Sequence, residues 1–175
     1  MSSEHHNENF WTKYIFSQDH KVIGIQYGIT SMLFLLFGFS LMMIMRWQLA
    51  YPDTPIPIVG WMFENRMLSP DMYNSFGAMH GTIMVFFVLT TAPQGGFGNY
   101  FLPIQIGAHD MAFPVLNMLS FWVTFVSMGV MVAAFFVVGG APISGWTAYA
   151  PLSVLGEIAG PGLGAGQNLW IISIA

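Results

Sequence analysis

The chain has 175 residues, of which 55% are hydrophobic and only 7% are charged, and its formal net charge is -4. An average soluble domain has about 25% charged residues, so the composition argues against a water-soluble globular protein, and the lack of a basic surface argues against nucleic acid as a partner. The chain contains no cysteine, which excludes disulfides, iron–sulfur clusters and thiolate metal sites within it. The polar stretch 1–14 lacks the basic region of a cleaved signal peptide.

Three long apolar blocks predict transmembrane helices at about 22–46, 73–92 and 115–138. A bilayer core of about 30 Å requires roughly 20 helical residues, so each block is long enough, the second with the smallest margin. A fourth apolar run, 168–175, is too short to cross, so we expect the start of a further helix, in either a fragment or one chain of a divided protein. The predicted fold class is all-α, a polytopic membrane helix bundle.

The segments between these blocks are rich in proline and glycine. Residues 47–72 contain four prolines among mixed charges, which indicates an ordered aqueous loop. The segment 93–114 is rich in glycine and is expected to be a connection. The segment 139–166 has too many glycines and prolines to form one long helix. Basic residues precede and follow the first block, so the positive-inside rule does not determine the orientation.

A single histidine, His80, lies inside the second block. An imidazole in hydrocarbon is costly without a partner, so it indicates a functional site. Its neighbours Gly77, Ala78 and Gly81 are small and are expected to leave room for a flat, bulky ligand. Two interpretations stay open at this point. His80 is either an axial ligand of a haem iron, with a second ligand from another helix, or a hydrogen-bonding residue that joins two helices.

The other polar side chains divide between the two faces of the predicted bundle. Because consecutive spans run antiparallel, Arg46, Tyr73 and His80 share one face, and Tyr73 points the same way as His80 two helical turns earlier. The opposite face holds Asn99, Asp110 and Asn117. Taken alone, Arg46 is either a snorkelling anchor or a donor to a cofactor held by His80. Asp110 is either a plain loop carboxylate or the mouth of a proton-uptake path.

Several long motifs resemble subunit I of the haem–copper oxidases, and they are close to the A-type cytochrome c oxidases. The motifs are MHG at 79–81, GGFGNYFLP at 95–103, IGAHDMAFP at 106–114 and GWTAYAPL at 145–152. They occur in the family's order and cover nearly the whole chain from about residue 17. The resemblance implies that residues 1–175 are the N-terminal part of one membrane-embedded catalytic subunit of the twelve-helix type.

The resemblance implies a haem-binding role for four residues. His80 matches the histidine that supplies one axial ligand to the iron of the low-spin haem, usually haem a. Arg46 matches the arginine that hydrogen-bonds the formyl group of that haem. Tyr73 and Trp146 match residues near its propionates, although taken alone both are equally typical of an interfacial aromatic belt.

The resemblance also implies a proton pathway. Asp110 matches the entrance of the family's D pathway, and Asn99 and Asn117 match the asparagines just inside it. In the family the N-terminus lies on the proton-uptake side, which agrees with the face that we assign to Asp110.

The implied activity is that of a terminal respiratory oxidase. Electrons from cytochrome c pass through the low-spin haem to a haem–copper site that reduces O2 to water, coupled to proton pumping. The high-spin haem and the copper are expected in the remainder of the subunit, not on this segment. The implied partners are that remainder, oxidase subunits II and III, cytochrome c and membrane lipid. The expected location is the bacterial plasma membrane or the mitochondrial inner membrane.

Two alternatives remain. A quinol-oxidising relative would carry an acid, a histidine and a glutamine where this chain has Ala50, Met72 and Ser75. These residues favour cytochrome c as the donor. A helical transporter or assembly subunit would use His80 only as a hydrogen-bonding residue. Gln48 stands where many relatives have a glutamate that helps to bind a structural cation, so the sequence leaves a cation site there open.

Overall fold

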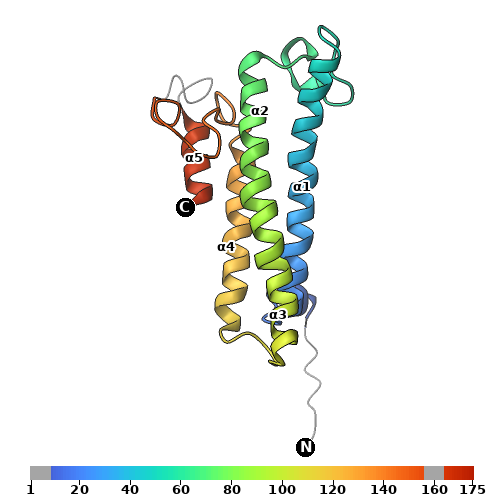
Figure 1. Cartoon of the computed structure of the whole chain (residues 1–175), viewed down its shortest axis with the longest axis vertical. Coiled ribbons are helices and arrows are strands. Elements are labelled where there is room, and N and C mark those ends of the chain that lie inside the picture. Colours follow the sequence, from blue (N-terminus) through green and yellow to red (C-terminus); the bar gives the residue numbers. More distant parts are fainter. Residues whose placement is uncertain (1–8, 156–163) are drawn as a thin grey trace, which may run out of the picture.

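The computed structural model of the chain describes residues 9–155 and 164–175. Within these ranges every regular element is a helix, and the long helices run side by side along one axis (Figure 1). The polar tail up to residue 8 and part of the glycine-rich connection, 156–163, lie outside the described residues. The predicted all-α fold class is confirmed for the part that the structure describes.

The first long helix is α1 (His20–Ala50), preceded by the short π-helical turn η1 (Trp11–Ile15). The Asp19 carboxylate caps α1 by accepting a hydrogen bond from the Lys21 N–H at 2.7 Å. The helix extends beyond the predicted 22–46 at both ends. The loop between Ala50 and Pro70 follows, and it contains two short helices, η2 (Gly60–Met62) and η3 (Glu64–Arg66).

The next three elements form one continuous rod: α2 (Pro70–Thr82), η4 (Ile83–Gly98) and α3 (Asn99–Ile106). The helix begins where the Ser69 hydroxyl accepts a hydrogen bond from the Met72 N–H at 3.3 Å, with a proline at its first position. In η4 the backbone ladder widens to π-helical geometry. The hydroxyls of Thr90 and Thr91 accordingly donate to carbonyl oxygens five residues back, at 2.8 and 2.9 Å.

The sequence predicts a connection from residue 93, whereas the helix continues to Ile106. Close packing against α1 explains why the glycines here do not end it. An ideal Cβ on Gly24 of α1 would lie only 3.0 Å from the Gly96 carbonyl oxygen and 3.0 Å from the Tyr100 nitrogen. Membrane helices commonly associate through such small residues and tolerate prolines within them. Pro93, Gly95 and Gly96 therefore lie within a helix that packs against α1, not in a loop.

The contact at Gly24 gives a prediction about stability. Gly24→Ala should destabilise the bundle by about 1–3 kcal/mol because its Cβ meets backbone atoms, and this outweighs the roughly 0.5–1 kcal/mol that alanine gains over glycine in a helix. Gly28→Ala is the matched control, since an ideal Cβ there meets nothing within 4 Å. Thermal unfolding of the detergent-solubilised protein measures the difference. Equal unfolding temperatures for the two variants would contradict the packing explanation.

The chain then reverses and returns along the bundle. Gly107 ends α3 with a φ of 70°, a conformation that glycine adopts without strain. The return helix α4 (Pro114–Ala133) stops before the end of the predicted block 115–138. The apolar residues after it fold as turns, and Phe135 packs against Phe37 of α1 at a ring-centroid distance of 5.5 Å. Apolar composition alone could not distinguish this packed turn from a further helical turn.

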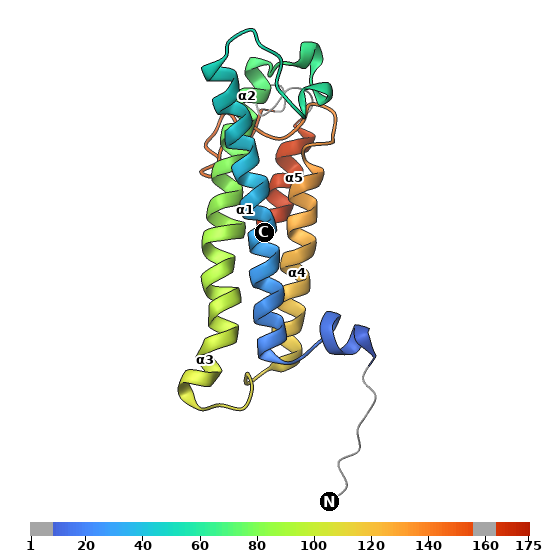
Figure 2. The ribbon, with the colours of Figure 1, turned by 90° about the vertical axis from the view of Figure 1, so that its right-hand side faces the viewer.

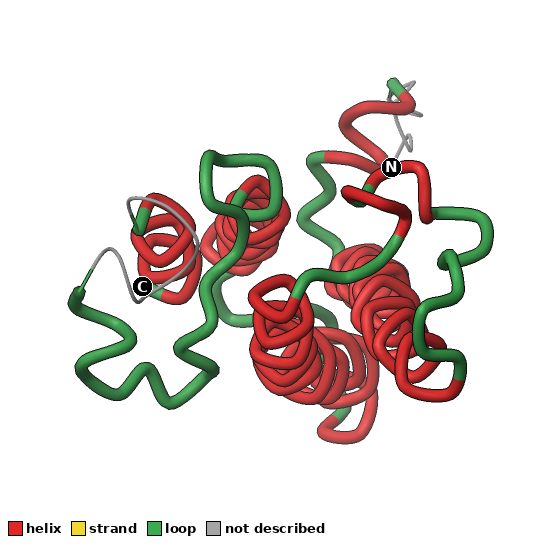
Figure 3. Tube along the Cα trace, turned by 90° about the horizontal axis from the view of Figure 1, so that it is seen from above, coloured by secondary structure: helices red, strands yellow, loops and turns green. Residues whose placement is uncertain are grey.

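The last helix is α5 (Ala165–Ile174), which begins slightly before the predicted 168–175 and packs against α4 (Figure 2). The Ser127 hydroxyl of α4 donates to the Ser173 carbonyl of α5. Seen from above, the helix that ends at the C-terminus lies at one edge of the bundle (Figure 3).

Three helices of the described chain are long and apolar enough to cross a membrane: His20–Ala50, Pro70–Ile106 and Pro114–Ala133. Their inner faces form a buried core in which Met79, Ile83 and Met131 are fully covered. Many outward-facing side chains are also large and apolar, as Leu36 and Phe39 of α1 illustrate. An apolar outer surface suits lipid, so the structure is a membrane helix bundle.

Candidate functional site

His80 lies near the end of α2, and its half-buried imidazole reaches across to α1. Its Nδ1 atom lies 2.8 Å from the carbonyl oxygen of Gly38. A carbonyl can only accept, so Nδ1 carries the proton and donates it, and Nε2 keeps its lone pair. Nε2 makes no hydrogen bond with any of the residues that the structure describes. Histidines that bind metals almost always donate their other ring N–H in this way, so the side chain fits an iron ligand.

Small residues allow α1 to approach both α2 and the start of η4 around this bond. An ideal Cβ on Gly38 would lie 3.1 Å from the Met84 sulfur. One on Gly77 would lie 3.3 Å from the Cε methyl of Met45. Gly77 therefore takes part in the contact with α1.

Trp146, another of the predicted cofactor residues, lies against the residue that follows His80. Its Cδ1 atom lies 3.9 Å from an ideal Cβ on Gly81, the residue after His80. The chain reaches this position through a turn at Gly145, where φ is 73°. The indole remains 53% exposed, so one side of it is open.

Arg46 and Tyr73 lie at the same end of the bundle, but neither is hydrogen-bonded to His80 in the structure. Arg46 is exposed, about 12 Å along α1 from the Gly38 carbonyl, and Tyr73 is half-buried, about 10 Å before His80 on α2. Arg46 and Tyr73 therefore lie at a similar position along the bundle axis, as the antiparallel arrangement of α1 and α2 predicts. Arg46 forms no hydrogen bond or ion pair with any other described residue.

The second predicted group lies at the opposite end of the bundle. The Asn99 side chain is buried and donates to the Gly95 carbonyl at 2.7 Å, while its Oδ1 has no partner. The side-chain nitrogen of Asn117 is likewise buried and without a partner. Asp110 is half-buried, and its carboxylate accepts the Met111 N–H at 2.7 Å. No hydrogen bond between described residues joins these three side chains directly, although buried unpaired amide atoms are commonly satisfied by ordered water.

Sequence reasoning missed three polar residues that belong to this second group. His20 is buried, and its Nδ1 lies 2.9 Å from the Asn99 carbonyl oxygen. The Tyr27 hydroxyl lies 3.0 Å from the Ser120 hydroxyl, which in turn donates to the Asn117 carbonyl at 2.7 Å. Tyr27 and Ser120 each lie in an apolar block, and the sequence alone does not show that these two blocks contact each other. One polar residue in each block was therefore only a weak indication of this pair.

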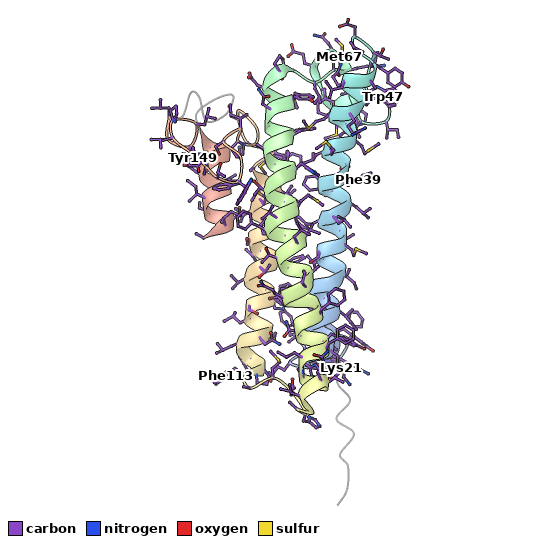
Figure 4. All side chains as sticks on the ribbon, viewed as in Figure 1. Lys21, Phe39, Trp47, Met67, Phe113 and Tyr149 are labelled. Atoms are coloured by element: carbon purple, nitrogen blue, oxygen red, sulfur yellow. The ribbon has the colours of Figure 1, made fainter. Side chains whose placement is uncertain are left out.

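The two groups occupy opposite ends of the molecule (Figure 4). Trp47, next to Arg46, lies at one end, and Phe113, shortly after Asp110, lies at the other. His80 and Asn99 are nineteen positions apart along the helical rod of α2, η4 and α3, which corresponds to a separation on the order of 30 Å. Among the described residues, no cluster of three or more His, Asp or Glu side chains could hold a metal ion by itself.

These features describe a membrane helix bundle in which His80, within the second span, keeps Nε2 without a hydrogen-bond partner among the described residues, with a separate group of polar side chains at the opposite end. Residues 22–175 match the family described as cytochrome c and quinol oxidase polypeptide I. The chain belongs to this family, the subunit I polypeptides of membrane-bound oxidases.

Curated relatives agree with this assignment. The chain is 43% identical over 156 residues to the alternative cytochrome c oxidase subunit 1 of Bradyrhizobium diazoefficiens, which covers 89% of this chain and 25% of that protein. It is 42% identical over 172 residues to cytochrome c oxidase subunit 1 of Thermostichus vulcanus, covering 98% and 28%. The Synechocystis protein of the same name is 44% identical over 171 residues, covering 97% and 27%. The chain thus spans about a quarter of the length of these relatives.

Proposed function

We propose that this chain is the N-terminal part of the catalytic subunit of a terminal respiratory oxidase. Cytochrome c donates electrons, which pass through a low-spin haem to a haem–copper site that reduces O2 to water, and this transfer is coupled to proton pumping. The hydrogen bond from His80 to the Gly38 carbonyl carries the proposal, because it leaves Nε2 free as an iron ligand. The high-spin haem and the copper belong to the remainder of the subunit in this proposal.

The residues around His80 are suited to hold the low-spin haem, which we propose is haem a. His80 would hold the iron of this group through Nε2, together with a ligand from another helix. The bound haem would supply electron transfer only. Arg46 would donate a hydrogen bond to the group, which would withdraw electron density and raise its reduction potential. We assign Tyr73 and Trp146 to the propionate side.

The residues at the other end are suited to admit protons. Asp110 is half-buried and can exchange protons with water without becoming a trapped buried charge. The unpaired amide atoms of Asn99 and Asn117 are suited to order water behind it. The linked hydroxyls of Tyr27 and Ser120 extend this polar region along the bundle. The first residue of α1, His20, lies at this end beside the Asn99 carbonyl, and in this proposal the N-terminus lies on the proton-uptake side.

Cytochrome c is a better-supported donor than quinol. Of the three positions at which quinol-oxidising relatives bind quinone, Ala50 and Met72 have no suitable polar group. Ser75 is buried, and its hydroxyl donates to the Ala141 carbonyl at 2.7 Å, so it is not free to bind a quinone. Subunits II and III are the further partners in this proposal. The complex lies in the bacterial plasma membrane or the mitochondrial inner membrane.

The absorption spectrum and the electron donor of the purified complex test this proposal together. We expect an a-type haem band and oxidation of reduced cytochrome c. A complex with only b- or o-type bands that oxidises quinol would instead be the quinol-oxidising relative. A complex without haem would contradict both and would favour a transporter or assembly subunit.

A further inference from the structure

Two buried hydrogen bonds fasten the C-terminal part of the described chain to α2. The Ser75 hydroxyl donates to the Ala141 carbonyl at 2.7 Å. The Trp170 indole N–H donates to the Thr82 hydroxyl at 3.2 Å. Ser75, Thr82 and Trp170 are all buried, so water does not compete for these bonds.

Two further contacts connect the loop after α4 to α5. The Ser144 hydroxyl donates to the Gln167 side-chain oxygen at 2.6 Å, and both residues are buried. Gly166 packs so tightly on Gly140 that an ideal Cβ there would collide with the Gly140 carbonyl oxygen. These two contacts join the start of the loop, at Gly140 and Ser144, to α5. We call the set Ser75, Thr82, Ala141, Ser144, Gln167 and Trp170 the clasp.

The two residues of the clasp that belong to α2, Ser75 and Thr82, lie before and after His80. Ser75 precedes His80 by little more than one helical turn, and Thr82 follows it by two positions. The loop that Ser75 holds leads directly to Trp146, whose ring lies against Gly81. Trp146 forms no side-chain hydrogen bond with any described residue and is 53% exposed. Its position against Gly81, the residue that follows His80, therefore depends on the loop that the clasp holds.

We propose that Ser75, Thr82 and Gln167 are positioning residues that hold the Trp146 indole against Gly81, the residue after His80, so that its covered side limits the access of water to that side of the site. The inference rests on the proposed function, in which His80 binds the low-spin haem. A water-excluding wall lowers the local dielectric and disfavours the more charged ferric state, so it raises the reduction potential. Loosening the clasp should lower that potential without removing the His80 ligand.

Redox titration of the low-spin haem in the assembled oxidase tests the proposal. Ser75→Ala should shift the reduction equilibrium toward the oxidised form by up to about tenfold, ~59 mV for one electron, with full haem content. Ser75→Thr keeps a hydroxyl and should restore the original value. Ser40→Ala is the matched control, since the exposed Ser40 hydroxyl bonds only within its own helix, to the Phe37 carbonyl at 2.7 Å. An unchanged potential in Ser75→Ala would overturn the proposal.

Trp170→Phe provides an independent arm, because it removes the indole N–H but keeps an aromatic ring. Trp170→Phe should also lower the reduction potential of the low-spin haem. If Ser75→Ala fails to assemble, a lowered potential in Trp170→Phe supports the proposal and an unchanged potential overturns it. Because the clasp acts through Trp146, the shift caused by Ser75→Ala should shrink in a Trp146→Ala background. An equal shift in both backgrounds would overturn the role of Trp146.

The failure of this inference differs from the failure of the proposed function. If His80 does not bind haem, His80→Ala keeps the low-spin haem signal. If only the clasp inference is wrong, His80→Ala loses that signal while Ser75→Ala and Trp170→Phe keep the original potential.

Discussion

Replacing His80 with alanine is expected to remove the low-spin haem signal from the assembled oxidase and to stop electron transfer to oxygen. Alanine has no nitrogen to offer the iron, and the remaining axial ligand cannot maintain a low-spin centre alone. The Gly38 carbonyl also loses its donor at the contact between α1 and α2. Reduced-minus-oxidised spectra and haem quantification of the purified complex measure the loss.

His109→Ala is the matched control for this experiment. His109 is exposed and lies beside Asp110 at the other end of the bundle, so its removal should leave the haem content unchanged. A low-spin signal of normal size in His80→Ala would mean that the iron has another ligand. His80 would then be only a residue that joins α2 to α1.

Asp110→Asn is expected to slow turnover and pumping while the haem content stays normal. Asparagine keeps an oxygen that can accept the Met111 N–H, so the local fold should persist, but it cannot carry a proton. We expect a loss on the order of 100-fold, the lower end of what a positioned proton-transfer group contributes. Oxygen consumption and proton release by the oxidase in vesicles measure the two effects.

Asp53→Asn controls for the loss of one negative charge, since Asp53 is an exposed loop residue at the other end of α1. It should leave turnover and pumping unchanged. Full pumping in Asp110→Asn would show that protons enter elsewhere, and the assignment of Asn99 and Asn117 would fall with it.

Hydropathy predicted which segments form helices more accurately than it predicted where those helices begin and end. The first block and α1 agree to within a few residues, because a long uncharged run has few alternatives to a helix in lipid. The rod that begins with α2 was predicted to end near residue 92 because Pro93 and Gly95 are usual breakers. The structure continues it, since the Gly24–Gly96 contact and the bonds of Thr90 and Thr91 compensate for them. Such compensation comes from tertiary packing, which the local pattern does not contain.

The candidate site was predictable in its residue types but not in its contacts. An ionisable residue in an apolar block was enough to single out His80, and antiparallel spans were enough to separate it from Asp110. The partner of His80 could not be predicted, because the Gly38 carbonyl is a backbone atom of another helix. The Tyr27–Ser120 pair and the clasp join distant segments in the same way. Each of these contacts depends on how a helix is rotated about its own axis. A block that is apolar on all sides does not determine that rotation.

An electron microscopy map of the complete oxidase tests the central claim most directly. We predict a porphyrin beside α2, with its iron bonded to Nε2 of His80 while Nδ1 still donates to the Gly38 carbonyl. A map in which this imidazole contacts only protein or lipid, with no porphyrin next to it, would contradict the claim.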